Sequence, residues 1–231
     1  MAEGVMLAAS KYTGSGMTSD RTRARMVEAL RLKGVKFEPV LAIMADVPRH
    51  VFLDEALKDR AYEVDKALPI GFGQTMSTPE IVAIMTTLLC EGARGVPERV
   101  LEIGTGCGYQ TAVLAKLATK VYTVERIAAL MDKARRTLRD LRYQNVIYKH
   151  ADGHFGYAER GPFDGIIMTA AATHIPEELK SQLAEGGRLV LPVGREAESQ
   201  KLIVVDRCGD KFTEKVVHDV RFVPLVAGIL Q

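Results

Sequence analysis

Apolar positions follow two different rhythms along the chain, and the rhythm changes near residue 99. Before that point, apolar residues recur at intervals of three and four, which is typical of amphipathic helices. Helices are predicted to begin at Ser19 or Asp20, at Pro39 and near Pro79, because a capping residue or a proline stands before each apolar stripe. Residues 61–78 hold proline and glycine in close succession and are predicted to be irregular.

Beyond residue 99, short apolar runs alternate with amphipathic segments. The runs predicted as buried strands are 100–103, 121–124, 146–148, 165–168 and 189–193, and the predicted helices are 108–118, 127–142 and 177–184. Strands that alternate with helices indicate a parallel sheet covered on both faces. After residue 193, two further runs at 202–206 and 215–222 flank a turn at 208–210, which predicts an antiparallel hairpin at the sheet edge.

The length of 231 residues suits one main domain with a single large core. Residues 1–18 are predicted to be a flexible tail, because they are small and polar at their end. Residues 19–231 are predicted to form the domain, with an N-terminal helical part at 19–98 and a sheet core at 99–231. The predicted fold class is therefore α/β, with a doubly wound, mostly parallel sheet, an antiparallel C-terminal edge and an N-terminal helical segment.

Composition excludes several classes of function. There are 31 Lys and Arg against 29 Asp and Glu, a balance that argues against a dedicated nucleic-acid binder. No apolar run approaches the roughly 18–20 residues that a membrane helix needs. The three cysteines, Cys90, Cys107 and Cys208, form neither a zinc pattern nor a disulfide framework. A protein of the reducing cytoplasm, with no metal and no membrane partner, is therefore expected.

Three alternating glycines follow the first predicted strand. The stretch Val100-Leu-Glu-Ile-Gly-Thr-Gly-Cys-Gly places Gly104, Gly106 and Gly108 between that strand and a helix, where backbone N–H groups can approach a ligand closely. The spacing differs from the G-x-G-x-x-G of dinucleotide sites, and no Lys-Ser or Lys-Thr pair follows as in a phosphate-binding loop. A purely structural turn and an NAD site remain the alternatives at this point.

Carboxylates stand near the ends of three predicted strands. Glu102 precedes the glycines by two residues, and Glu125 closes the next strand, where a carboxylate can accept hydrogen bonds from both ribose hydroxyls of a nucleoside. Asp152 and Gly153 follow the third strand, where they could pair with an adenine ring, although Asp-Gly is more often an ordinary turn. Together, the glycines and acids resemble the S-adenosylmethionine site of Rossmann-like methyltransferases.

The stretch Leu68-Pro-Ile-Gly-Phe-Gly-Gln-Thr-Met-Ser-Thr-Pro resembles the signature of protein-L-isoaspartate O-methyltransferases, which read close to P-I-G-x-G-Q-T-I-S-x-P. Other stretches similar to this family follow one another along the chain at 47–52, 100–112, 123–126, 162–167, 186–194 and 221–225. The resemblance covers about residues 19–226. Several similar stretches in the same order are far more specific than one motif.

The resemblance implies a carboxyl methyltransferase that begins the repair of damaged proteins. Such an enzyme uses S-adenosylmethionine, giving S-adenosylhomocysteine, to esterify the free carboxylate of L-isoaspartyl residues; the ester then cyclises to a succinimide, whose hydrolysis returns some normal aspartate. Ser77, the candidate catalytic residue, would contact the substrate carboxylate. The cofactor would contact Thr75, Met76, Ser77, Glu102, Gly104, Gly106, Gly108, Glu125, Asp152 and Gly153, and the substrate backbone would contact Val223, Pro224 and Leu225.

Four positions depart from the family pattern without removing a polar group that the chemistry requires. Met76 replaces the usual Ile, Cys107 stands where Ser is common, Ala151 where Gly is common, and Val226 where some members have Thr. A carboxylate nucleophile is already ionised at pH 7, because carboxyl pKa values lie near ~4. The reaction therefore needs alignment of the reacting atoms rather than a general base.

Ser77 also has a purely structural interpretation. Ser77-Thr-Pro-Glu80 fits a helix capping box, and Thr78 could instead cap the helix with Pro79 in its first turn. Two other functions stay open as well: a methyltransferase of the same fold that acts on a small molecule or RNA, and a binding module that keeps the fold without activity. The glycines and acids that an inactive module could lose are all present.

Overall fold

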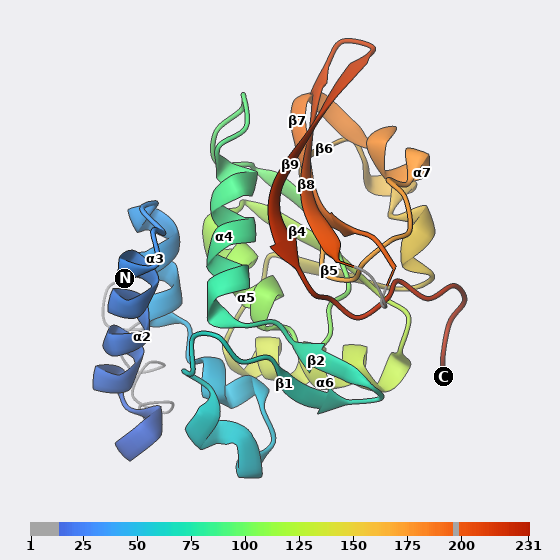
Figure 1. Cartoon of the computed structure of the whole chain (residues 1–231). Helices are drawn as coiled ribbons and strands as arrows, with labels where there is room; N and C mark the ends of the chain where they lie inside the picture. Colours follow the sequence, from blue (N-terminus) through green and yellow to red (C-terminus); the bar gives the residue numbers. More distant parts are fainter. Residues whose placement is uncertain (1–13, 196–198) are drawn as a thin grey trace.

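The structure is a computed structural model that describes residues 14–195 and 199–231. Its centre is a seven-stranded sheet with the order β5-β4-β3-β6-β7-β8-β9 (Figure 1). The strands are β3 (Arg99–Ile103), β4 (Lys120–Glu125), β5 (Val146–His150), β6 (Phe163–Met168), β7 (Leu183–Val193), β8 (Gln200–Cys208) and β9 (Lys211–Val220). The first five strands in this order are parallel, and β8 and β9 are antiparallel, which confirms the predicted fold class.

The strand order changes direction beside β3, and this places the site. The chain runs from β3 outward to β4 and β5, and then returns to the other side of β3 as β6. Loops that follow β3 and β6 therefore leave in opposite directions and open a crevice at the carboxyl ends of these strands. In open α/β sheets, ligands bind at such a switch point.

Helices and short segments cover both faces of the sheet. The helices are α2 (Asp20–Leu32), α3 (Glu38–Asp46), α4 (Pro79–Cys90), α5 (Tyr109–Leu117), α6 (Ala128–Asp140) and α7 (Glu177–Lys180). On one face, Met85 and Leu89 of α4 and Leu114 of α5 pack on Val100 and Val121. On the other face, the side chains that alternate with these, such as Leu101 and Tyr122, share a core with Leu179 of α7.

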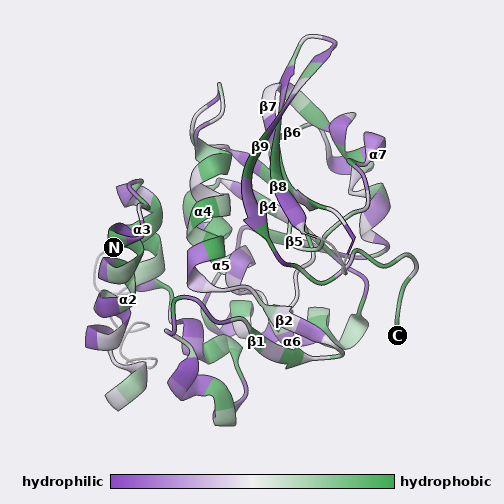
Figure 2. Cartoon of the chain, in the orientation of Figure 1, coloured by the Kyte–Doolittle hydropathy of each residue, from purple (hydrophilic) through white to green (hydrophobic). Residues whose placement is uncertain are grey.

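The hydropathy of the elements agrees with these layers. Figure 2 shows α4 and β6 as mostly hydrophobic, whereas the edge strand β9 is largely hydrophilic. Every residue of β6 is buried, and most of β9 is exposed. Within the described residues, no helix is both long enough and apolar enough to cross a membrane.

Two expectations differ from the structure. Residues 61–78 are not wholly irregular, because β1 (Leu68–Gly71) and β2 (Gln74–Met76) form a short antiparallel hairpin. Phe72 and Gly73 at its tip both have positive φ, the backbone that a tight two-residue hairpin turn requires. The helix predicted at 177–184 ends at Lys180, because Leu183 already pairs with Phe163 as the start of β7. Only this pairing with a distant strand decides the boundary.

The remaining short elements join the larger ones. They are the 3-10 helices η1 (Gly16–Thr18), η2 (Arg49–Phe52), η3 (Glu55–Arg60), η4 (Gly153–Phe155) and η5 (Ala158–Arg160). Most of the tail predicted at residues 1–18 lies outside the described residues, which begin at residue 14. Its described end includes η1, which leads directly into α2.

Candidate active site

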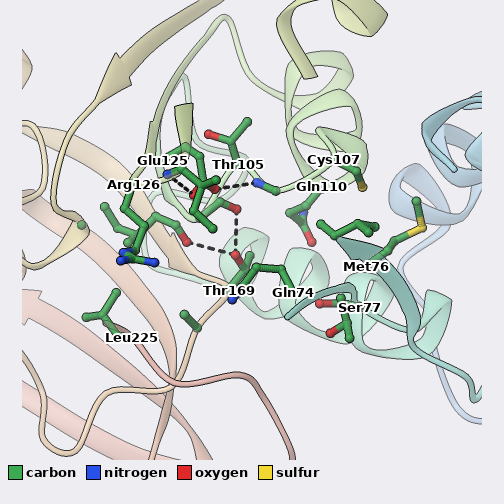
Figure 3. A pocket seen from close by; sticks show the side chains of 18 of the residues that line it. Gln74, Met76, Ser77, Thr105, Cys107, Gln110, Glu125, Arg126, Thr169 and Leu225 are labelled. Atoms are coloured by element: carbon green, nitrogen blue, oxygen red, sulfur yellow. Dashed lines mark hydrogen bonds between the residues drawn. The ribbon is translucent and has the colours of Figure 1, made fainter. Parts of the chain in front are cut away.

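A cavity of about 830 Å³, measured with its open mouth, lies at the carboxyl ends of β3, β4 and β6. The hairpin β1–β2, the loops after these three strands and the C-terminal residues 224–226 form its walls. Figure 3 shows Glu125 and Thr105 on one side, with Met76 and Ser77 across from them. The structure brings together nine of the predicted site residues as lining: Thr75, Met76, Ser77, Gly104, Gly106, Glu125, Gly153, Pro224 and Leu225.

The glycine loop has a backbone that admits no side chain at Gly104. Its φ is +95°, a conformation that L residues with a Cβ rarely adopt. A Cβ at this position would also collide with Oγ1 of Thr169. Thr169 cannot easily move, because its hydroxyl lies 2.8 Å from the Gly104 carbonyl oxygen and its backbone N–H donates to Ile103. The loop therefore passes close to the cavity as bare backbone.

Glu125 ends β4 with its carboxylate held in one orientation. Oε2 accepts a hydrogen bond from the Gly106 backbone N–H, and Oε1 accepts one from Ile127, both at 2.9 Å. The residue is only 6% exposed, and it lines the cavity. An ionised carboxylate has about four acceptor positions, so lone pairs remain for hydroxyl groups of a ligand. Glu125, which was predicted from the sequence to bind ribose, therefore stands at the cavity wall with acceptor positions free.

Glu102 does not line the cavity, although the sequence suggested cofactor contact. It is fully buried behind the glycine loop, where Oε2 accepts hydrogen bonds from Thr111 at 2.5 Å and Thr123 at 2.6 Å. Burial raises the pKa of Glu102 to about 8, against the two hydroxyl donors that lower it. Side chains alternate along a strand, so Glu102 points sideways toward α5 rather than out of the strand end.

Three other predicted residues also lie off the cavity wall. Gly108 caps the start of α5 and packs against α6, where a Cβ would lie 3.1 Å from that of Ala134. Val223 reaches the sheet through its carbonyl, which accepts from Ala171 at 2.8 Å. Asp152 lines a neighbouring cavity instead. These three residues therefore do not line the cavity, and the contacts given above hold the segments around it in place.

Asp152 attaches the C-terminal segment, residues 223–230, of which 224–226 line the cavity. Its Oδ2 accepts from the Gly228 backbone N–H at 2.6 Å, and its Oδ1 accepts from the His154 backbone N–H at 2.9 Å. Burial opposes the charged form, but these donors hold the pKa of Asp152 below its ordinary value. Leu230 adds a second attachment, since its N–H donates to Arg126 at 2.7 Å.

The hydroxyl of Ser77 is not used as a helix cap. Thr78 is the N-cap of α4, with its Oγ1 accepting from the Ile81 N–H at 3.1 Å, and Pro79 occupies the first turn. The structure thereby decides between the two capping schemes. Among the described residues, no hydrogen bond engages the Ser77 side chain, whereas its carbonyl accepts from Arg49 at 2.6 Å. The hydroxyl is left available at the cavity wall.

Sequence reasoning missed several polar residues of the wall: Gln74, Thr105, Gln110, Arg126 and Thr169. Four of them lie inside the stretches that resemble the family, close in sequence to predicted site residues. That proximity could have identified them as candidates for the cavity wall. Thr169 follows the end of β6, and the rule that ligands bind beyond strand ends could have found it. Gln110 is buried on α5 with its amide donating to Thr86 at 3.0 Å.

Comparisons with known proteins agree with this geometry. A family model described as protein-L-isoaspartate(D-aspartate) O-methyltransferase matches residues 21–229. The chain is 55% identical to protein-L-isoaspartate O-methyltransferase 1 of Marinobacter nauticus, over 96% of this chain and 99% of the relative. It is 53% identical to the protein-L-isoaspartate O-methyltransferase of Nitrosomonas eutropha, over 95% and 98% of the two chains.

Two solved structures have the same architecture. One, a protein-L-isoaspartate O-methyltransferase, aligns with a TM-score of 0.78 at 26% identity and covers 90% of this chain and 67% of its own. The other comes from Plasmodium falciparum and is described as a putative protein-L-isoaspartate O-methyltransferase in complex with S-adenosyl-L-homocysteine. It aligns with a TM-score of 0.72 at 26% identity, over 88% and 98% of the two chains.

The residues that line the cavity fit S-adenosylmethionine, independently of the comparisons with known proteins. A bare glycine backbone at the switch point leaves room for close approach, and the fixed Glu125 carboxylate offers acceptors at the end of the neighbouring strand. A Cβ at Gly153, on the same wall, would lie 2.6 Å from Ile103, so this side is also kept as bare backbone. The chain therefore belongs to the protein-L-isoaspartate(D-aspartate) O-methyltransferase family and is an S-adenosylmethionine-dependent methyltransferase.

Proposed function

We propose that this chain esterifies the free carboxylate of L-isoaspartyl residues in damaged proteins and peptides, with Ser77 orienting that carboxylate for methyl transfer. The observation that carries the assignment is the Ser77 hydroxyl, which stands at the cavity wall while Thr78 alone caps α4. The methyl ester then leads to repair by way of a succinimide. Family membership and the geometry of the cavity both support this reaction.

Bound S-adenosylmethionine supplies a methyl group on a positively charged sulfur, which leaves as a neutral thioether. Glu125 would accept the ribose hydroxyls, and the backbone around Gly104, Gly106 and Gly153 would lie against the rest of the cofactor. Thr75 and Met76 would line the path to Ser77. Glu102 supports the loop from behind through Thr111 and Thr123, and Asp152 holds the C-terminal segment near the site.

The chain's own task in the reaction is alignment. The substrate carboxylate is ionised at neutral pH, with an ordinary pKa near ~4, so no side chain has to remove a proton. In agreement, the described residues that line the cavity include no histidine. One hydroxyl, that of Ser77, can orient the carboxylate without saturating its lone pairs. Ideal orientation of reacting groups can lower the barrier by about 7–11 kcal/mol, so even partial alignment supplies several kcal/mol.

The proposed partners are isoaspartyl proteins and peptides, with neither nucleic acid nor metal required. A cytoplasmic location is proposed on the state of the cysteines, because Cys90, Cys107 and Cys208 are all free and Cys208 is exposed. A reducing compartment keeps such thiols free. The C-terminal residues Val223, Pro224 and Leu225 would face the peptide backbone, with Pro224 and Leu225 at the cavity wall.

The reaction is tested with two peptides that differ only in one residue, L-isoaspartate or L-aspartate. Each is incubated with the purified protein and S-adenosylmethionine, and the mass increase of a methyl ester is followed. We expect the ester on the isoaspartyl peptide alone. If neither peptide is methylated while the protein still binds S-adenosylhomocysteine, the substrate assignment is wrong and only the methyltransferase assignment stands.

The role of Ser77 is tested by Ser77→Ala. Loss of a hydrogen bond to a charged group costs about 1.5–3 kcal/mol, so kcat is expected to fall by about 10- to 150-fold. Calorimetry should give an unchanged affinity for S-adenosylhomocysteine. Thr78→Ala is the matched control, because loss of the N-cap costs about 1 kcal/mol of stability and should leave kcat nearly intact. Full activity of Ser77→Ala with a lowered Tm would show that Ser77 has only a structural role.

A further inference from the structure

Arg49 is a buried cation directly behind the part of the cavity wall that carries Ser77. It belongs to η2 and is 0% exposed. Its Nη2 donates to the Ser77 carbonyl at 2.6 Å, and its Nε donates to the Ala61 carbonyl at 2.7 Å. The guanidinium lies over the ring of Tyr109, 4.6 Å from the ring centroid. Both Ser77 and Tyr109 line the cavity, so one layer of residues separates Arg49 from a ligand.

The charge of Arg49 has no counterion within the described residues. Its acceptors are neutral carbonyl groups, and its Nη1 is buried with no hydrogen-bond partner, as is the hydroxyl of Tyr109. Burial lowers the pKa of Arg49 from its usual value. Arginine side chains are almost never fully buried unless they are paired, because removing the charge from water is costly. A structural brace between two loops would not need an unpaired positive charge.

A part-buried arginine elsewhere, Arg188 on β7, shows the usual arrangement. Arg188 donates from Nε to Asp206 at 2.6 Å and from Nη2 to the same carboxylate at 2.8 Å. Its charge is therefore neutralised within the sheet. Arg49 is more deeply buried than Arg188 and yet lacks such a carboxylate. In the proposed reaction, the anionic group beside Ser77 is the free carboxylate of the substrate.

We propose that Arg49 is a positioning and specificity residue: it fixes Ser77 through the Ser77 carbonyl, and its unpaired charge makes the cavity select a free carboxylate over the corresponding neutral amide. The inference rests on the proposed reaction at the same site. Coulomb interactions weaken slowly with distance inside a protein, so a charge one layer away still acts on the ligand. The hydroxyl of Ser77 alone could bind either a carboxylate or an amide, since a hydroxyl both donates and accepts.

The test uses two peptides of the same sequence, one with isoaspartate and one with isoasparagine, in which the free carboxylate is a carboxamide. Calorimetry measures the affinity of each for the full-length protein saturated with S-adenosylhomocysteine. The wild type is expected to prefer the isoaspartyl peptide by about tenfold or more, which corresponds to about 1.4 kcal/mol. Equal affinities in the wild type would overturn the proposal without any variant.

Two variants separate charge from bracing. Arg49→Gln keeps an N–H donor but loses the charge, and we expect the preference for isoaspartate to fall by about tenfold. Arg49→Lys keeps the charge but loses the planar fork, so the preference should persist while kcat falls. Arg188→Gln, which removes a part-buried, paired arginine elsewhere, should lower Tm and leave the preference unchanged.

The outcomes distinguish the inference from the proposed function. If both Arg49 variants weaken the two peptides by the same factor, Arg49 is only a brace and the inference is wrong. If Arg49→Gln does not fold, Arg49→Met, which keeps much of the side-chain length without the charge, replaces it, and an unchanged preference for isoaspartate would overturn the inference. Absence of methyl transfer to the isoaspartyl peptide by the wild type would instead contradict the proposed function itself.

Discussion

The two walls of the cavity are built differently. The cofactor wall, made of the loops after β3, β4 and β6, is anchored in the central strands and held by backbone contacts such as that between Glu125 and Gly106. The substrate wall, made of the hairpin β1–β2 and the C-terminal segment, is carried by short elements with exposed side chains; Phe72 is 56% and Val226 is 41% exposed. In the proposed reaction, one wall would recognise an invariant small molecule, and the other would accept peptides of varied sequence.

This difference in construction predicts which property of the enzyme each wall controls. A loop whose backbone is fixed between sheet strands presents the same donors and acceptors to every ligand, which favours binding without reorganisation. A hairpin with an exposed tip and a segment held by a few hydrogen bonds can adjust to different side chains at little cost. Changes to the cofactor wall should therefore alter cofactor affinity, whereas changes to the substrate wall should alter turnover.

The largest effect is expected from Gly104→Ala on the cofactor wall. The new Cβ meets both a positive φ and Oγ1 of Thr169, so the loop must move. A displacement of about 1 Å can cost about 100-fold, and we expect a loss of that order in affinity for S-adenosylhomocysteine. Gly73→Ala is the control on the substrate wall: its φ is also positive, at +69°, but nothing lies within 4 Å. Equal effects of the two variants on cofactor affinity would remove the contrast between the walls.

A moderate effect is expected from Glu125→Ala. The change leaves ribose hydroxyls without acceptors, which weakens cofactor binding by roughly 1–3 kcal/mol. It also frees the backbone N–H groups of Gly106 and Ile127, so Tm should fall. Titration calorimetry with S-adenosylhomocysteine measures the first effect and thermal unfolding the second. An affinity equal to that of the wild type would refute the assignment of Glu125.

The smallest effect is expected from Asp152→Asn, which weakens the attachment of the C-terminal segment. The single amide oxygen can accept from only one of the two backbone N–H groups, those of Gly228 and His154, that the carboxylate now binds, so stability should fall by about 1 kcal/mol. Hydrogen exchange at the Gly228 amide should become faster, with kcat changed by less than a few-fold. An unchanged exchange rate at Gly228 would show that the segment is held mainly elsewhere.

The pH dependence of this attachment has a definite sign. The pKa of Asp152 in the folded protein lies below its ordinary value, so the folded state favours the carboxylate. Its contribution to stability is therefore complete above the ordinary pKa near ~3.9 and is lost as the pH falls through the lower, folded-state pKa. Across the neutral range, the wild type and the variant should differ by a constant amount.

Strand and helix order followed from the sequence because each element repeats its own spacing of apolar residues. The hairpin β1–β2 did not, since its strands have four and three residues and its pairing depends on the turn at Phe72 and Gly73. Such short strands carry too few positions for a spacing to be recognised. The end of α7 was mistaken for a similar reason, because pairing of Leu183 with Phe163 is not visible locally.

Of the two glutamates predicted for the cofactor site, the one at a strand end lines the cavity and the one within a strand does not. Glu125 is the last residue of β4 and reaches the cavity, whereas Glu102 lies one residue inside β3 and turns toward α5. Both were predicted as site residues because they are acidic, but residue type alone does not show which way a side chain points. Arg49 was missed for the opposite reason, because arginine is rarely buried and nothing in its immediate sequence predicts that it is.

The bare backbone at Gly104 also has a genetic consequence. Any missense change in the first or second position of a glycine codon adds a side chain, and every such side chain contains the Cβ that Thr169 excludes. Every single-nucleotide missense change at this position should therefore disturb the loop. In a saturation mutagenesis library selected for cofactor binding, no substitution of Gly104 should survive, while several substitutions of Gly73 at the open hairpin tip should be tolerated.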